Sequence, residues 1–140
     1  MLGRRLVIAG GLLLLSLGLV MAQQAALKKL EGRYKAVHAE KASGPAPKEL
    51  IESLTITIKG NKMTLKLGDD EKSAEIKVDA DQMPPAMDIL PQDPDNKGKI
   101  FRAIYRLDKD ELLIVISEKG DRPKDFKAEG DAVLLKLRRE

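Results

Sequence analysis

Alternation of apolar and polar residues is the dominant pattern along most of the chain. In residues 54–59 every second position is Leu or Ile and the others are Thr or Lys, and residues 62–67 repeat this alternation after Gly60-Asn61. A period of two is typical of a half-buried β-strand, and a Gly-Asn pair between two such runs indicates a tight hairpin turn. The sequence therefore predicts antiparallel strands at 54–59 and 62–67.

The same reasoning predicts about eight short strands in one small domain. The others are residues 33–40, 73–79, 86–90, 99–107, 111–117 and 132–139. The connections are too short for parallel crossovers, so the strands are expected to be antiparallel. The residues expected to face inward are Tyr34, Ala36, Ile56, Ile58, Met63, Leu65, Ile76, Val78, Met87, Ile89, Phe101, Ala103, Tyr105, Ile114, Ile116, Leu135 and Leu137.

Closure into a barrel is the architecture that this strand count favours. An open sheet would leave two long edges and one uncovered apolar face, whereas a barrel of about eight strands removes both problems. A two-sheet sandwich is the main alternative. One short helix is predicted over Pro47 to Leu54, between the first two long strands, because Pro stands near its start and its apolar residues share one face.

The N-terminal residues have the pattern of a secretory signal. Arg4 and Arg5 precede an apolar stretch, and Val20 and Ala22 place small residues at the −3 and −1 positions of a cleavage site. We expect a signal peptide over 1–22, a leader over 23–29 and the barrel domain over 30–140. The predicted location is secreted or periplasmic, with an uncleaved inner-membrane anchor as the alternative.

Composition excludes several classes of function. The chain of 140 residues has no Cys, so it has no disulfide, thiolate nucleophile or Cys-built metal site. Removing Arg4 and Arg5 from the 25 Lys and Arg residues leaves 23 against 22 Asp and Glu, so the processed chain is nearly neutral. Because basic and acidic residues also alternate along the chain, nucleic-acid binding is not expected, and neither is membrane binding after cleavage.

No set of residues indicates catalysis or a cofactor. His38 is the only imidazole, and alternation places it on the same strand face as Tyr34, but no Ser lies in a nucleophile-elbow pattern. The segment 93–98 imitates the start of a calcium loop, yet Lys97 and Ile104 stand where ligands are needed. We therefore predict a protein that is not an enzyme and holds no metal or cofactor.

Five ordered motifs resemble an uncharacterised lipocalin-like domain family that is abundant in planctomycete bacteria. They are LEGRYKAV at 30–37, APKEL at 46–50, IYRLD at 104–108, RPKDF at 122–126 and LRRE at 137–140. The family has no established activity, so the resemblance implies a barrel and an extracytoplasmic setting. In the wider lipocalin-like group a Gly-x-Trp motif closes one barrel end beneath a basic residue. By this resemblance Gly32, Tyr34 in place of Trp, and Arg139 are expected to close the barrel, with the guanidinium over Tyr34.

Two functional hypotheses remain open at the level of sequence. In the first, the barrel binds a small apolar ligand, and the expected lining or lid residues are Met63, Met87, Phe101, Tyr105 and Phe126. In the second, the barrel is solidly packed and acts as a structural or protein-interaction module. Residues Leu112–Ile116 are apolar on both faces, which indicates either cover on both sides or contact with a protein partner or a second copy.

Overall fold

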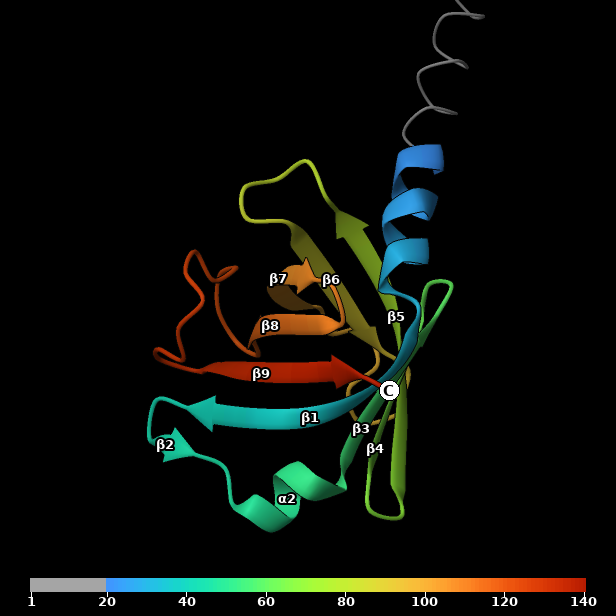
Figure 1. The fold of residues 1–140 in the computed structure, drawn as a ribbon. Coiled ribbons are helices and arrows are strands. Elements are labelled where there is room, and N and C mark those ends of the chain that lie inside the picture. The colour runs from blue at the N-terminus through green and yellow to red at the C-terminus, as the bar shows by residue number, and fades with distance from the viewer. Residues whose placement is uncertain (1–19) are drawn as a thin grey trace, which may run out of the picture.

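The computed structural model describes residues 20–140, and most of the predicted signal peptide, residues 1–19, lies outside the described part. Eight strands form a closed antiparallel barrel (Figure 1). They are β1 (Gly32–Lys41), β3 (Leu54–Lys59), β4 (Lys62–Leu67), β5 (Asp70–Asp79), β6 (Ala86–Pro91), β7 (Phe101–Asp108), β8 (Glu111–Ser117) and β9 (Ala132–Arg139). The short strand β2 (Gly44–Pro45) pairs antiparallel with the last two residues of β1 only. The barrel prediction is confirmed and the sandwich alternative is wrong.

Strand β1 closes the barrel because it pairs on both sides. Its first residues pair with β3, with Tyr34 opposite Ile56, and its later residues pair with β9, with Ala36 opposite Leu137. All neighbouring strands are antiparallel and follow one another in chain order from β3 to β9. Every long strand therefore has partners on both edges, which removes the open edges that favour aggregation.

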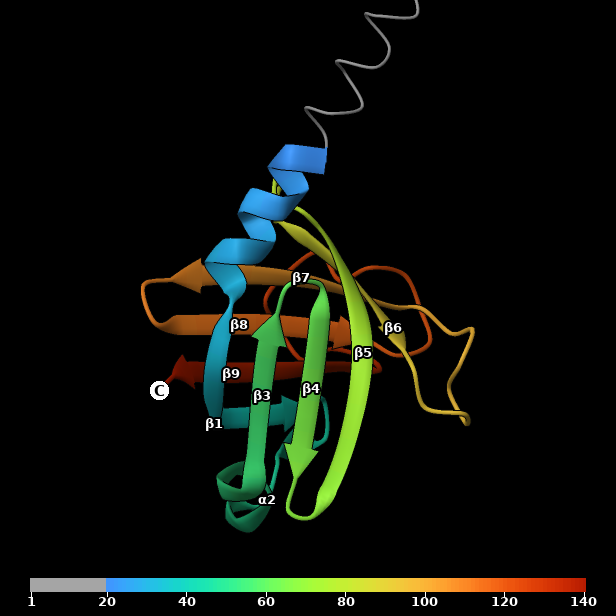
Figure 2. The ribbon, with the colours of Figure 1, turned by 90° about the vertical axis from the view of Figure 1, so that its right-hand side faces the viewer.

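The two helices lie at opposite ends of the barrel (Figure 2). Helix α1, described over residues 20–30, leads directly into β1 and packs near the turn at Gly60-Asn61. Helix α2 (Lys48–Ser53) lies where β3 begins, and the predicted helix between the first two long strands is confirmed. Within residues 20–140, no helix has the length and apolar character that crossing a membrane requires.

The barrel interior is the main hydrophobic core. Every residue expected to face inward either belongs to the buried core or packs against it, because side chains two positions apart share a face of a strand. The core also contains Leu27 and Leu30 of α1 and Leu112 of β8, which were not in the expected set. Residues 23–29, expected to be a leader, lie within the described part of α1, and Leu27 packs into the domain.

A β-bulge in β1 changes the predicted position of His38. The pairing of β1 with β9 shifts register between Ala36 and His38, so Ala39 takes the next inward position and is buried. An extra residue in one strand reverses the facing of every residue after it. His38 is half-exposed beside Glu40, with 3.7 Å between Nε2 and Oε1, and the expectation that it shares the face of Tyr34 is wrong.

A second apolar cluster lies on the outside of the barrel. Ile104 of β7, Val115 of β8, and Ala132 and Leu134 of β9 are buried there. The segment between β8 and β9 covers them, and its Phe126 packs against the cluster. Strand β8 is apolar on both faces because one face lines the barrel and the other lies under this segment.

Candidate functional site

One end of the barrel is closed by Arg139 and Tyr34. The guanidinium carbon of Arg139 lies 5.3 Å from the centroid of the Tyr34 ring, and Nη2 donates a hydrogen bond to the Tyr34 hydroxyl at 2.8 Å. The same Nη2 donates to the backbone carbonyl of Lys29 at 2.8 Å, and the Tyr34 hydroxyl donates to the carbonyl of Leu30 at 2.7 Å. These bonds fix the last turn of α1 over the barrel end, where they satisfy carbonyls that a helix terminus leaves unpaired.

Gly32 leaves room for the Arg139 side chain. A Cβ atom at Gly32 would lie 2.8 Å from Nε of Arg139, closer than two such atoms approach. Gly32 also has a φ of +151°, in the region that favours glycine. Gly32, Tyr34 and Arg139, the three residues expected at the barrel closure, therefore meet at this end.

Two buried tyrosines have perturbed acidity. Burial raises the pKa of the Tyr34 phenol, and the hydrogen bond and positive charge of Arg139 offset part of that rise. Burial also raises the pKa of Tyr105, and the negative charge of Asp79 adds to it. Both effects follow from the cost of placing a phenolate away from water.

The other end of the barrel contains an apolar cavity of about 490 Å³. Its inner wall consists of aliphatic side chains from β3, β4, β5, β6, β8 and β9, with Phe101 at the start of β7. The lining residues are Leu50, Leu54, Ile56, Met63, Leu65, Leu67, Lys72, Ser73, Ala74, Ile89, Pro91, Asp93, Asn96, Phe101, Ile114, Ile116, Glu118, Val133 and Leu135. A cavity of this volume and lining is typical of a small-molecule site.

The residues predicted to line a ligand site separate into three places. Met63 and Phe101 line the cavity. Met87 and Tyr105 belong to the buried core but not to the cavity wall. Phe126 packs on the outer cluster, with the Arg106 guanidinium carbon 5.0 Å from its ring centroid, and it is absent from the cavity lining. Phe126 lies in a long loop, where no alternation of apolar and polar residues indicates which side of the barrel a side chain faces.

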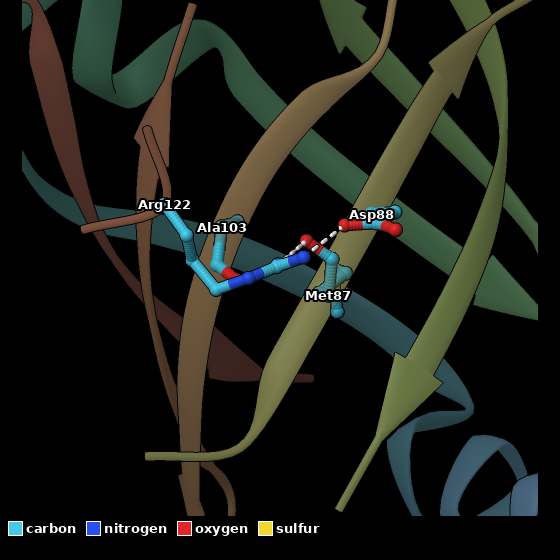
Figure 3. Close-up of polar contacts among 4 residues, drawn as sticks. All are labelled: Met87, Asp88, Ala103 and Arg122. Atoms are coloured by element: carbon cyan, nitrogen blue, oxygen red, sulfur yellow. Dashed lines mark hydrogen bonds and ion pairs between the residues drawn. The ribbon is translucent and has the colours of Figure 1, made fainter. Parts of the chain in front are cut away.

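Arg122 fastens the segment that carries Phe126 (Figure 3). Its Nη1 donates to the backbone carbonyls of Met87 at 3.0 Å and Ala103 at 2.8 Å, and its Nη2 lies 2.6 Å from Oδ1 of Asp88. Arg122 therefore links the loop between β8 and β9 to the outside of β6 and β7. A guanidinium suits this position because it presents several donors in one plane.

The region Leu112–Ile116, which the interaction hypothesis assigns to a partner contact, is divided between the two cores. Leu112 and Ile114 face the barrel interior, and Val115 is fully buried in the outer cluster. The apolar outer face that motivated the interaction hypothesis is thus covered by the chain's own segment around Phe126. Ile100, just before β7, keeps 44% of its surface exposed.

The segment resembling a calcium loop forms a local turn. The Asn96 side chain donates to Oδ2 of Asp93 at 2.8 Å, and its backbone N–H donates to the Asp93 carbonyl. Short polar side chains commonly stabilise turns in this way. Among residues 20–140, no group of three or more His, Asp or Glu side chains is arranged to hold a metal ion.

Sequence reasoning missed two features of these sites. Leu27 and Leu30 are three positions apart, a helical spacing, but the run was too short to show that it packs over the barrel. The sequence does not indicate the role of Arg122, because its partners Met87 and Ala103 contribute backbone carbonyls, which every residue has.

The fold and the site define a class of protein, a small closed antiparallel β-barrel with one sealed end and an apolar cavity at the other. Comparisons with protein-family models, with curated proteins and with solved structures found no match for the chain.

Proposed function

We propose that this protein is an extracytoplasmic, non-enzymatic, lipocalin-like barrel that binds one small apolar ligand in the cavity. The observation that carries the proposal is the cavity of about 490 Å³ itself. Several of its aliphatic residues are only half-buried, including Leu65, Ile116 and Val133. Covering such side chains with a ligand gains roughly 25 cal/mol for each Å² of apolar surface removed from water.

The sealed end supports a binding role because it closes the barrel at the end opposite the cavity. Tyr34, Leu30 and Arg139 close the barrel without any ligand, so the domain is held together independently of what occupies the other end. A preformed cavity loses little conformational freedom when it binds, which favours affinity.

The distribution of polar groups supports a function without catalysis. His38, the one imidazole of the chain, is on β1 beside Glu40 and is absent from the cavity lining. The inner wall of the cavity offers hydrocarbon surface, which holds a ligand but supplies no acid, base or nucleophile. The extracytoplasmic setting rests on the signal pattern of residues 1–22.

A pair of variants on β4 tests the proposal. Leu65 lines the cavity, whereas Thr64, its neighbour, belongs to the alternate row of the same strand and is absent from the lining. The neutral dye N-phenyl-1-naphthylamine is expected to gain fluorescence on binding the protein. Leu65→Trp, which places a bulky indole in the cavity, should abolish that gain, and Thr64→Trp should preserve it, with thermal unfolding used to show that both variants fold.

Native mass spectrometry of freshly purified protein provides a second test. A bound apolar molecule that is present with the Thr64→Trp variant and absent with Leu65→Trp supports the cavity as the binding site. A protein that carries no ligand and does not bind the dye contradicts the proposal.

A further inference from the structure

The cavity extends only partway along the barrel. On each of β3, β6, β8 and β9, two successive inward-facing residues line it, counted from the mouth. In that order of strands they are Leu54 and Ile56, Pro91 and Ile89, Ile116 and Ile114, and Val133 and Leu135. Strand β4 contributes a third, Met63, beyond Leu67 and Leu65. The cavity is therefore about two layers of side chains deep.

The next inward residues on the four strands form the floor of the cavity. None of them lines it, and each has at most 1% of its surface exposed. They are Ile58 of β3, Met87 of β6, Leu112 of β8 and Leu137 of β9, and all belong to the buried core. Because protein interiors pack as densely as organic crystals, a ligand cannot extend past this layer without displacing it.

The spacing of inward residues sets the depth of the cavity. Residues that share a face lie about 7 Å apart along a strand, and barrel strands tilt by about 40° to the barrel axis, so two layers span on the order of 10 Å. An extended chain of atoms advances roughly 1.2 Å for each bond. The floor therefore admits a straight alkyl chain of about eight carbon atoms.

The cavity is wide for its depth. A volume of about 490 Å³ over this depth gives a cross-section on the order of 50 Å². Carbon atoms in contact lie about 4 Å apart, so a single extended chain occupies roughly 20 Å². One straight chain would leave more than half of the cross-section unfilled, and the wall beside that empty space would lose its dispersion contacts.

We infer that the ligand is short and wide, with a fused-ring or branched hydrocarbon body in place of a single long alkyl chain. This inference rests on the proposed function, because it gives the shape of the molecule that the same cavity binds. The floor around Met87 limits the length of the ligand, and the width of the barrel is filled by the ring body. A ring body also has few rotatable bonds, so it loses little conformational entropy on binding.

Two alcohols with the same number of carbon atoms and different shapes test the inference. Cyclododecanol and dodecan-1-ol, used below their solubility limits, compete with N-phenyl-1-naphthylamine for the protein. Both are neutral, so charged side chains at the mouth such as Lys72 and Glu118 do not distinguish them. Each buried methylene contributes about fourfold in affinity. Because about four carbon atoms of the straight chain stay in water, cyclododecanol should bind about tenfold more tightly.

A series of straight-chain alcohols locates the floor. Affinity should rise about fourfold for each methylene from hexan-1-ol to octan-1-ol, and much less from octan-1-ol to dodecan-1-ol. Met87→Ala removes part of the floor, so it should extend the rise by about two carbon atoms and reduce the preference for cyclododecanol. Affinity that keeps rising fourfold per methylene up to dodecan-1-ol in the unmodified protein would contradict a floor at this depth.

Val115→Ala is the matched control for Met87→Ala. It also shortens a fully buried side chain, but Val115 belongs to the outer cluster and does not line the cavity. It should leave the chain-length series and the preference for cyclododecanol unchanged, with thermal unfolding used to show that both variants fold. The two alcohols compared on the unmodified protein decide the inference even if Met87→Ala does not fold.

The outcomes separate this inference from the proposed function. If dodecan-1-ol binds as tightly as cyclododecanol or more tightly, and Leu65→Trp still abolishes binding, the shape assignment is overturned and the apolar site stands. If neither the alcohols nor the dye bind in a manner that depends on Leu65, the proposed function fails and the shape assignment fails with it.

Discussion

The guanidinium of Arg139 covers the Tyr34 ring and donates a hydrogen bond to its hydroxyl at 2.8 Å. Arg139 comes from the last residues of the chain and Tyr34 from the first strand, so this contact joins the two ends of the barrel domain. Nη1 of Arg139 also lies 3.5 Å from Oδ1 of Asp110, so Arg139 contacts the turn between β7 and β8 as well. The sealed end therefore depends on a single planar side chain.

Arg139→Lys should destabilise the protein although it keeps the positive charge. A lysine ammonium cannot reach Tyr34, Asp110 and the Lys29 carbonyl from one position as the planar guanidinium does. We expect a loss of about 1–3 kcal/mol in the free energy of unfolding, measured by urea denaturation. Arg138→Lys at the exposed neighbouring position should change it by less than about 0.5 kcal/mol. Equal effects of the two variants would contradict the proposed role of Arg139.

Gly32→Ala should disturb the same contact from the opposite side. The new Cβ would meet Nε of Arg139 at 2.8 Å, and the φ of +151° adds backbone strain. We expect a loss of about 1–3 kcal/mol in unfolding free energy. Gly44→Ala is the matched control, because Gly44 has a φ of +133° but a Cβ there meets nothing within 4 Å. Its smaller loss measures the backbone contribution alone, so a loss as large as that of Gly32→Ala would remove the steric argument.

The two buried tyrosines predict a loss of stability at alkaline pH. Burial raises the pKa of Tyr34 and of Tyr105 above the ordinary value of 10.0, so the folded state holds these protons more tightly than the unfolded state. The stability that the two neutral phenols contribute is therefore complete below pH 10.0, and it is lost as pH rises through their higher pKa in the folded protein. Urea denaturation from about pH 8 to about pH 11 measures the slope of the unfolding free energy against pH. Tyr105→Phe should make the slope shallower, and an unchanged slope would show that Tyr105 does not contribute.

Arg122→Ala should loosen the segment between β8 and β9. The variant removes the donors to the Met87 and Ala103 carbonyls and the ion pair with Asp88, and we expect a loss of about 1–3 kcal/mol in unfolding free energy. Amide exchange in β7 and β8 should also become faster because the cover of Ile104 is weakened.

Asp88→Asn is the graded control for Arg122. It removes only the ionic part of one contact, and its effect should stay below about 1 kcal/mol. If Arg122→Ala proves no more destabilising than Asp88→Asn, the two carbonyl contacts do not stabilise the segment.

The fold was predictable because its determinants are local. Alternation within each strand and turns such as Gly60-Asn61 identified the strands, and the number of strands implied closure. The bulge at His38 could not be predicted, because it arises from how β1 fits β9, and a single extra residue leaves the composition of the strand unchanged. The cavity could not be predicted either. Alternation showed that Leu65 and Ile116 face inward, but whether inward side chains meet depends on the width of the barrel.

Helix α1 provides the last prediction, which concerns the segment around the expected cleavage site. Val20 and Met21 are exposed, whereas Leu27 and Leu30 are buried in the core. A chain that begins at Gln23 should therefore unfold with a free energy within about 0.5 kcal/mol of the full chain.

The buried half of α1 should behave differently in the same assay. Leu30→Ala should cost about 2–5 kcal/mol, because it leaves a void at the sealed end. Lys28→Ala on the exposed side of the helix is the matched control. If the chain beginning at Gln23 is as unstable as Leu30→Ala, residues before the cleavage site contribute to the fold, and cleavage after Ala22 would then weaken the barrel that it releases.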